Sequence, residues 1–386
     1  MLNAVKIKWR IQVIVGVLKE TAEHERRVAL TPEVTAQLIE KDLEVWVEPD
    51  AGLNSNFPND QYKDAGATVA GNRDEVLSNS DILLTIQTPA EDELKKLKKG
   101  AVLICFLWAL QHPELVELLK EQGVSALGMD AVPRISRAQN MDALSSMSSI
   151  AGYKSALIAA NELDKYLPMM MTAAGTIPPA KTLVLGAGVA GLQAIATLRR
   201  LGAVVEAFDI RPEVKEQVES LGAKFVEVEL GDEDTQTEGG YAKELDEKKQ
   251  DLQRQAIHKH CKKSDIVITT ALIPGRPAPI LIKEEMVKDM SPGSVIVDIA
   301  SENGGNCELT EHGKTVEKFG VKIVGPNNLP SQLSLHASKL YSKNMYALLN
   351  LLLEDGTPNF NFEDEILLKT TITHQGEVIS PMLKGS

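Results

Sequence analysis

The sequence predicts an α/β protein with two Rossmann-like domains, each built on a doubly wound parallel sheet. The length of 386 residues suits two ordinary domains. Short β-branched runs alternate with helical segments along most of the chain, which is the pattern of parallel sheets with crossover helices. A glycine-rich turn at residues 186–191 opens a second series of this alternation. These three observations define the predicted architecture.

The first series occupies the N-terminal third of the chain. Helical patterns are expected at TPEVTAQLIEK, residues 31–41, and at PELVELLKEQG, residues 113–123. The expected strands around them are IQVIVGV, LEVWVEP, DILLTIQ, AVLICFL and VSALGMD. IQVIVGV is better interpreted as the first strand than as the core of a signal peptide, because no convincing small-residue cleavage site follows it.

The second series follows a predicted helix, AGYKSALIAANELDKYL, and a methionine-rich run, MMMTAAGTIPPA, interpreted as adaptable core or interface packing. After Pro330, a helical segment is expected to return to the first domain. The predicted domains are therefore 1–145 with 332–386, and 146–331. The expected strands of the second domain are TLVLGAG, AVVEAFD, AKFVEVEL, DIVITTAL, SVIVDIA and VKIVGP.

The composition excludes several classes of protein. Hydrophobic residues make up 43% and charged residues 25%, as in globular proteins. The net charge of −13 argues against a nucleic-acid partner, which would require a basic surface. Three scattered cysteines predict neither a disulfide framework nor a metal cluster, and favour a reducing compartment. No run of about 18 apolar residues predicts a membrane span, so a cytoplasmic location is expected.

The turn GAGVAG carries the strongest functional signal. It joins the apolar run TLVL to a helical pattern, and Asp209 ends the next strand about 20 residues further on, as the dinucleotide-binding fingerprint requires. Gly186 allows the tight turn, Gly188 lets the backbone approach a pyrophosphate, and Gly191 lets helix and strand pack closely. Val189, Ala190 and Ile210 complete the predicted nucleotide-binding segments. The alternative is a glycine-rich structural turn in an unrelated α/β protein.

Two residues after this second strand bear on the choice of nucleotide. The Asp209 carboxylate would accept hydrogen bonds from a ribose 2′-hydroxyl and repel a 2′-phosphate, which favours NAD over NADP. Arg211 could instead accommodate that phosphate, or be a solvated side chain beside the adenine. Thr270 and Ala271, at the end of DIVITTAL, are also expected to touch the nucleotide, because ligands bind beyond the carboxyl ends of such strands.

Two further segments contain candidate residues. RAQNMDALSS places Gln139, Asp142 and Ser145 at three-residue steps, with Arg134 just upstream; helix capping or a plain Arg134–Asp142 ion pair would also explain them. The segment 231–255 begins acidic and glycine-rich, so its first half is expected to be a mobile surface loop. It carries the tripeptide Gly239, Gly240 and Tyr241.

The chain resembles the alanine dehydrogenase and nicotinamide nucleotide transhydrogenase group over almost its whole length. GVLKETAEHERRVALTP, TTALIPGRPAP and VDIASENGGNCE are similar to the signatures of that group. PRISRAQNMDALSSMSSIAGY, MMMTAAGTIPPAK and GGYAKE resemble the NAD(H)-binding component of the proton-translocating, Re/Si-specific transhydrogenases. By this resemblance, Arg134, Gln139, Asp142 and Ser145 line the nicotinamide end of the site, and Gly240 and Tyr241 belong to a loop that closes over the nucleotide.

The chain departs from the alanine dehydrogenases at two positions. Those enzymes use a lysine and a histidine where this sequence has Gln87 and Trp108. An amide and an indole cannot act as acid or base near neutral pH, so the resemblance to amino-acid dehydrogenases does not extend to their chemistry. Arg27 and Glu302 keep their polar character. An alanine-dehydrogenase-like enzyme and a non-catalytic NAD(H)-binding module remain as alternatives.

The resemblance implies hydride transfer between NADH and NADP⁺ bound on a partner subunit, coupled to proton movement across a membrane. The implied partners are a membrane-spanning proton-channel subunit and an NADP(H)-binding subunit. A homodimer, peripheral on the cytoplasmic face of the inner membrane, is also implied. No metal is expected, since His258 and His260 are interpreted as a solvated helix face. Glu302, Asn303 and Asn306 are interpreted as turn residues around Gly304 and Gly305.

Overall fold

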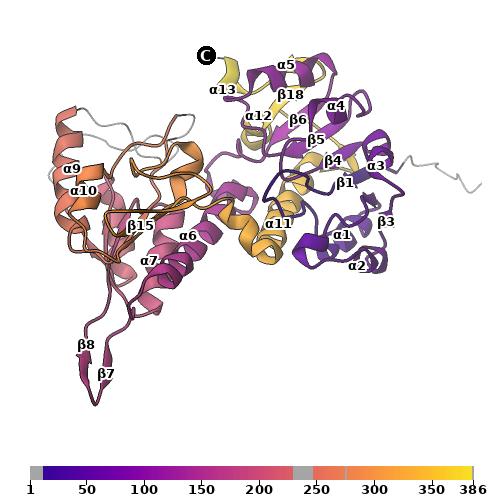
Figure 1. The fold of residues 1–386 in the computed structure, drawn as a ribbon. Helices are drawn as coiled ribbons and strands as arrows, with labels where there is room; N and C mark the ends of the chain where they lie inside the picture. Colours follow the sequence, from indigo (N-terminus) through magenta and orange to yellow (C-terminus); the bar gives the residue numbers. More distant parts are fainter. Residues whose placement is uncertain (1–11, 229–246, 274–275, 385–386) are drawn as a thin grey trace, which may run out of the picture. The chain divides into compact units, whose positions relative to one another are not determined.

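The computed structural model describes residues 12–228, 247–273 and 276–384. The chain divides into two compact units, residues 1–144 with 334–386 and residues 145–333. Each unit contains its own large β-sheet, and the C-terminal segment from Ser334 onward belongs to the first unit (Figure 1). The α/β class with two parallel-dominated sheets is thus confirmed.

The sheet of the first unit has the order β19-β18-β6-β5-β4-β1-β2-β3. Strands β1 to β6 are parallel, with β1 central, as in a doubly wound sheet. Their bounds are Ile14–Val17, Glu44–Val47, Thr68–Val69, Ile82–Leu84, Val102–Cys105 and Ser125–Gly128. The helices between them are α1 (Pro32–Ile39), α2 (Asn59–Asp64), α3 (Arg73–Asn79), α4 (Glu91–Leu94) and α5 (Pro113–Glu121).

The sequence of this unit explains its packing. Strands β4, β5 and β6 are buried along their whole length, which is typical of a parallel sheet covered on both faces. Pro32 and Pro113 occupy first-turn positions of α1 and α5, where a missing N–H costs nothing. A Cβ on Gly16 would lie 1.8 Å from Ser80 Oγ, so glycine is required where α3 crosses β1.

The returning C-terminal segment completes the first unit. The long helix α11 packs against α1 and against a 3₁₀ turn, η2 (Ser136–Met141). Strand β18 then pairs antiparallel with β6 and covers the edge of the sheet, which would otherwise expose unpaired backbone groups. The elements of this segment are α11 (Ser334–Leu352), β16 (Leu353–Glu354), β17 (Thr357–Pro358), α12 (Glu365–Thr370), β18 (Thr371–His374), β19 (Glu377–Val378) and α13 (Pro381–Lys384).

The sheet of the second unit has the order β11-β10-β9-β12-β13-β15-β14. Strand β9 is central, and β14 is the antiparallel edge strand that the sequence did not predict. The strands are β9 (Lys181–Leu185), β10 (Val204–Phe208), β11 (Lys224–Phe225), β12 (Ile266–Thr269), β13 (Val295–Asp298), β14 (Thr315–Lys318) and β15 (Val321–Val324). The helices are α6 (Ala143–Glu162), α7 (Val189–Arg200), α8 (Lys215–Ser220), α9 (Glu247–Cys261) and α10 (Glu284–Lys288).

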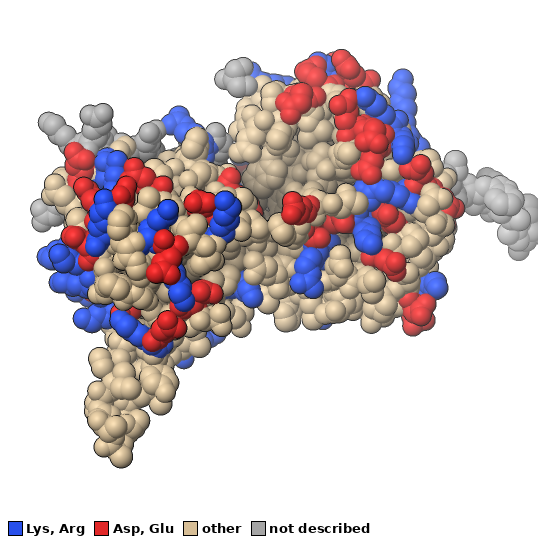
Figure 2. All heavy atoms as spheres, in the orientation of Figure 1, with Lys and Arg blue, Asp and Glu red and all other residues tan. Residues whose placement is uncertain are grey.

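The methionine-rich run forms an antiparallel hairpin of β7 (Met170–Thr172) and β8 (Gly175–Ile177). It extends away from the sheet of its unit in Figure 1. Met169 is 59% and Met171 79% exposed, so the prediction of core packing was wrong for these side chains. The hairpin carries no charged residue and is tan to its tip in Figure 2. It is an exposed apolar element.

Candidate functional site

The turn after β9 has the steric properties that its glycines predict. Gly186 has a φ of +96°, and a Cβ there would lie 2.6 Å from Thr270 Oγ1. A Cβ on Gly191 would lie 1.9 Å from the carbonyl oxygen of Gly186. Both contacts are shorter than real side chains allow, so glycine is required at both positions. The turn is therefore held tightly against the first turn of α7.

The space beside Gly188 is open, in contrast to the other two glycines. A Cβ on Gly188 would meet no atom closer than Arg211 Nη2, at 4.0 Å. Val189 and Ala190 follow as the first residues of α7, whose opening N–H groups have no partner within the helix. Because these groups and the helix dipole favour an anion, the turn fits the pyrophosphate of a dinucleotide.

Asp209 lies at the carboxyl end of β10 and is buried. Its Oδ2 accepts the N–H of Ala187 at 2.7 Å, which fixes the carboxylate against the glycine turn. The guanidinium of Arg211 binds both oxygens, with Nε–Oδ1 2.9 Å and Nη2–Oδ2 2.7 Å. This ion pair raises the pKa of Arg211. The Arg211 side chain is only 13% exposed, so its interpretation as a solvated side chain was wrong. Ile210 is partly buried against the core.

Thr270 and Ala271 follow β12, and both are tied to neighbouring loops. Thr270 Oγ1 donates to the carbonyl of Gly186 at 3.1 Å. Asn306 accepts the Ala271 N–H at 3.0 Å and donates to the Ala271 carbonyl at 2.9 Å and to that of Pro279. The Asn306 side chain is fully buried, so its role extends beyond the turn that the sequence suggested. It fixes the loop that carries two predicted nucleotide-binding residues.

Two more residues support this unit, and sequence reasoning missed both. Asp298 is fully buried and accepts hydrogen bonds from the backbone of Asn306 and Cys307 and from Thr310 Oγ1. Gly152 on α6 lies so close to α7 that a Cβ would be 2.0 Å from the carbonyl oxygen of Ala190. The only sequence signal was a glycine inside a helical pattern, which marks close packing when it is not a cap.

The segment predicted to orient the nicotinamide forms the turn η2 in the first unit. Ala138 and Met141 are buried, while Gln139 is exposed on another face of the turn. Asn344 on α11 donates to the carbonyl of Asn140 at 2.8 Å. Arg137 makes a bidentate ion pair with Asp364, with Nη1–Oδ2 2.6 Å and Nη2–Oδ1 3.0 Å. The C-terminal segment therefore holds the turn in place.

The neighbouring candidates take positions that the sequence left open. Arg134 is exposed just before η2. Asp142 ends η2 and immediately precedes α6. Because α6 begins at Ala143, Ser145 lies inside its first turn, and the alternative of Ser145 as the N-cap of a helix starting near Ser148 was wrong. That Gln139, Asp142 and Ser145 meet the glycine turn around one nucleotide stays a prediction, as do the roles of Gly240 and Tyr241, which lie outside the described residues.

The positions that differ from the alanine dehydrogenases lie near a buried polar cluster in the first unit. Arg27 binds Glu25 with Nε–Oε1 2.7 Å and Nη2–Oε2 2.5 Å. Gln87 Nε2 donates to Glu25 Oε2 at 3.1 Å. Burial raises the pKa of Glu25, but the hydrogen bonds and charge of Arg27 outweigh it and lower that pKa to about 2. Trp108 is 40% exposed and stacks on Phe106. The Gln87 amide is thus engaged in holding a carboxylate.

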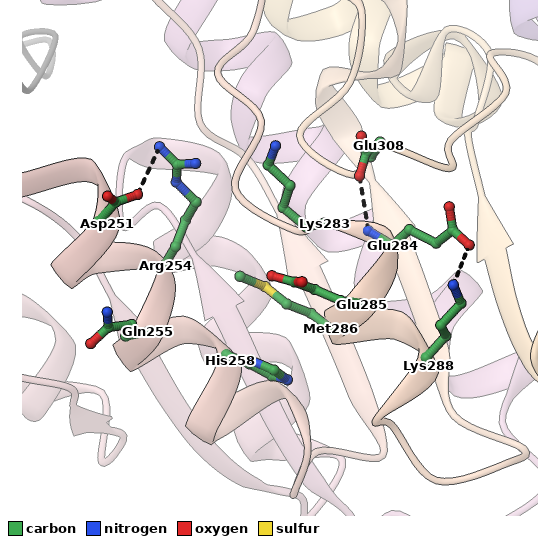
Figure 3. A pocket seen from close by; sticks show the side chains of 10 residues that line it. All are labelled: Asp251, Arg254, Gln255, His258, Lys283, Glu284, Glu285, Met286, Lys288 and Glu308. Atoms are coloured by element: carbon green, nitrogen blue, oxygen red, sulfur yellow. Dashed lines mark hydrogen bonds and ion pairs between the residues drawn. The ribbon is translucent and has the colours of Figure 1, made fainter. Parts of the chain in front are cut away.

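A surface groove of about 550 Å³ lies between α9 and α10, away from the glycine turn in sequence (Figure 3). Its walls mix both charges, as in the pairs Asp251–Arg254 and Glu284–Lys288. His258 lines it and pairs with Asp289, while His260 is partly buried and pairs with Glu206. Over the described ranges no three His, Cys, Asp or Glu side chains are grouped to hold a metal. The groove contains none of the predicted site residues.

Two family models match the chain. Residues 16–151 match "Alanine dehydrogenase/PNT, N-terminal domain", and residues 155–381 match "Alanine dehydrogenase/PNT, C-terminal domain". Among the helices of the described ranges, none combines the length and apolar character that crossing a bilayer requires.

Individual relatives agree with the family models. The chain is 48% identical to an NAD(P) transhydrogenase subunit alpha protein of Rhodospirillum rubrum, over 96% of this chain and 99% of that protein. It is 32% identical to the alanine dehydrogenase of Bacillus subtilis, over 82% and 80% of the two chains. The solved structure of a transhydrogenase from Sinorhizobium meliloti superposes with a TM-score of 0.85 at 44% identity, covering 95% of this chain and all of that one.

Proposed function

Because the chain belongs to the alanine dehydrogenase/PNT family, we propose that it is the NAD(H)-binding subunit of a proton-translocating transhydrogenase. In this proposal, it exchanges hydride between NADH and NADP⁺ held on a separate NADP(H)-binding subunit. The exchange is coupled to proton movement through a membrane-spanning subunit, and the chain lies peripherally on the cytoplasmic face of the inner membrane. NAD(H) is its cofactor.

One observation supports transhydrogenation over amino-acid oxidation. The chain keeps the open glycine turn, but Gln87, at the position of the dehydrogenases' lysine, donates its amide to Glu25. Oxidation of an amino acid needs a group that takes a proton from the substrate nitrogen, and neither an amide nor an indole can do so near neutral pH. Hydride transfer between two nicotinamides needs no such base, because only a hydride moves.

The residues of the chain then act by binding and orientation. Bound NADH supplies the hydride. The N–H groups at the start of α7 hold the pyrophosphate beside Gly188, and the Asp209 carboxylate holds the adenine ribose. Gln139, Asp142, Ser145 and Arg134 orient the nicotinamide and its ribose at near-attack distance from the second nucleotide. Tyr241 and Gly240 belong to the loop that excludes water when the site closes.

The exposed hairpin supports assembly as a homodimer. Met169 and Met171 are largely solvent-accessible within an uncharged hairpin, and a surface of this kind favours burial against another chain. A second copy of the chain is the proposed occupant. Mass measurement in solution of the wild type and of a Met169→Asp, Met171→Asp variant tests this: a variant that stays dimeric contradicts the hairpin's role.

The decisive experiment adds the partner subunits. NADH binding to the purified chain is followed by fluorescence, and the chain alone is then assayed with pyruvate and ammonia. Finally, hydride transfer to NADP⁺ is measured with and without the membrane partner. Binding with transfer only when the partner is present is expected. Turnover of pyruvate and ammonia by the chain alone would contradict the proposal and would identify an amino-acid dehydrogenase with an unusual acid–base group.

Gln139 provides a test within the site. Gln139→Asn shortens the side chain by one methylene while keeping the amide, so hydride transfer should fall strongly, ~10²-fold, because a misplacement of about 1 Å has that cost. NADH binding should stay nearly intact. Gln61→Asn on the exposed face of α2 is the matched control. An unchanged transfer rate would remove Gln139 from the reacting geometry.

A further inference from the structure

The Asp209 carboxylate has no acceptor position left for a ligand. Its Oδ1 accepts the N–H and the Nε–H of Arg211, each at 2.9 Å. Its Oδ2 accepts the N–H of Ala187 at 2.7 Å and the Nη2–H of Arg211 at 2.7 Å. A carboxylate offers about four lone-pair positions. The chain itself therefore fills the group that a ribose must reach.

These four bonds differ in how easily a ligand can replace them. The N–H groups of Ala187 and Arg211 belong to the backbone of the turns that follow β9 and β10, and both are fixed by the fold. The two guanidinium bonds end a rotatable side chain. The same guanidinium lies nearest to the open space beside Gly188, with Nη2 4.0 Å from where a Cβ would be. A ribose hydroxyl can therefore reach Asp209 only after the Arg211 side chain moves.

We propose that Arg211 is an internal competitor for the ribose-binding carboxylate, and that it thereby determines the specificity of the site between nucleotides with and without a 2′-phosphate. NADH must break the Arg211–Asp209 pair, so the arginine weakens NADH binding. Once displaced, its charge lies where it offsets the repulsion between Asp209 and a 2′-phosphate, so the arginine strengthens NADPH binding. The inference rests on the proposed binding of NAD(H) at the glycine turn.

The test is a pair of titrations on the full chain. Dissociation constants for NADH and for NADPH are measured by fluorescence for the wild type, Arg211→Ala and Arg211→Lys. For Arg211→Ala, NADH should bind ~3- to 30-fold more tightly, as expected if one charge-assisted pair no longer competes, while NADPH should bind more weakly. Arg211→Lys should lie between, because an ammonium cannot form the bidentate pair.

Controls separate this effect from general electrostatics and from misfolding. Arg200→Ala removes an exposed positive charge from α7 and should change the affinities for the two nucleotides in the same direction. Circular dichroism and urea midpoints confirm that the Arg211 variants are folded. Arg211→Lys keeps the inference testable if Arg211→Ala fails to fold. Unchanged or weaker NADH binding in a folded Arg211→Ala variant overturns the inference.

Asp209→Ala distinguishes failure of the inference from failure of the proposed function. If Asp209→Ala weakens NADH binding but Arg211→Ala does not tighten it, only the competition by Arg211 is wrong. If neither variant changes NADH binding, the nucleotide does not use this carboxylate, and both the inference and the proposed ribose contact are wrong. Opposite shifts for NADH and NADPH in Arg211→Ala support the competition.

Discussion

The two sheets of this molecule share a structural device but not its consequence. In the first unit, Glu48 follows β2, and its Oε2 accepts the N–H of Lys19, two residues beyond β1, at 2.8 Å. In the second, Asp209 follows β10 and accepts the N–H of Ala187, two residues beyond β9, at 2.7 Å. Both sheets therefore tie the end of their second strand to the turn after their first in the same way.

The difference lies in the turn and in what neutralises the carboxylate. The first unit has Leu18, fully buried, where the second has Gly186, and no helix begins directly after its turn. Glu48 is held by Arg73 of α3, which also binds Glu93. Asp209 is instead held by a rotatable arginine two residues away. A doubly wound sheet with an acidic strand end thus does not create a nucleotide site by itself; the glycines and the helix N-terminus make backbone N–H groups accessible.

The largest change in stability is expected from the buried ion pair of the first unit. Arg27→Ala leaves the Glu25 carboxylate buried without its cation and should lower the free energy of unfolding by ~3–5 kcal/mol. The Arg27 and Glu25 side chains are 5% and 0% exposed. Urea unfolding measures the change, and Arg26→Ala, next in the chain and exposed, is the control. A loss below ~1 kcal/mol, typical of a surface pair, would contradict the description of this cluster as buried.

The two equivalent carboxylates provide a matched comparison. Asp209→Ala should weaken NADH binding by about tenfold or more, because it removes a charged hydrogen-bond acceptor from the ribose. Glu48→Ala should leave NADH binding unchanged and lower the free energy of unfolding by ~1–2 kcal/mol, because the Lys19 N–H loses its partner. Fluorescence titration and urea unfolding of both variants measure these effects. Equal loss of NADH binding in both would abolish the distinction between the units.

The pH dependence of stability sharpens the comparison further. Burial raises the pKa of Glu20 from 4.5 to about 8, and the charge of Glu25 adds to this against the Ile86 N–H and Arg27. Between these two values the folded chain keeps a proton that the unfolded chain has released. The contribution of Glu20 to stability therefore falls as pH rises through this window.

Glu20→Gln removes this titration while keeping an acceptor for the Ile86 N–H. The variant should gain ~1–2 kcal/mol relative to wild type between about pH 5 and pH 8, reduced from the full linkage because Glu20 is half-buried. Urea midpoints at several pH values measure it, and the exposed Glu23→Gln is the control. A constant difference between variant and wild type over this range would show that Glu20 does not titrate there.

The smallest change in stability is expected from Arg137 and Asp364. The Arg137 side chain is 56% exposed, so solvent screens the pair despite its bidentate geometry. Asp364→Asn removes the charge but keeps the side-chain oxygen that caps α12 at the Ile366 N–H. The urea midpoint should shift less than in any variant above. A shift as large as that of Arg27→Ala would mean that the pair holds the C-terminal segment in place.

Much of the site could be predicted because its requirements are local. Glycines 186, 188 and 191, the strand before them and Asp209 lie within one stretch, and the steric need for glycine is set by the turn itself. The position of Ser145 could not be predicted, because the start of α6 depends on η2 and its contacts with α11, far along the chain. The antiparallel strands β14 and β18 were missed because sequence patterns do not show which chain end covers a sheet edge.

The sequence by itself determined the α/β class and the position of the dinucleotide turn, because hydrophobic periodicity and glycine sterics act between neighbouring residues. It also indicated the absence of an acid–base pair at Gln87 and Trp108. Only the tertiary structure decided that Arg211 occupies Asp209 and that Asn306 fixes the loop at Ala271. The physical reason is that a buried polar side chain takes whichever partners the fold brings within hydrogen-bond distance, and residues 271 and 306 meet only after their strands have paired.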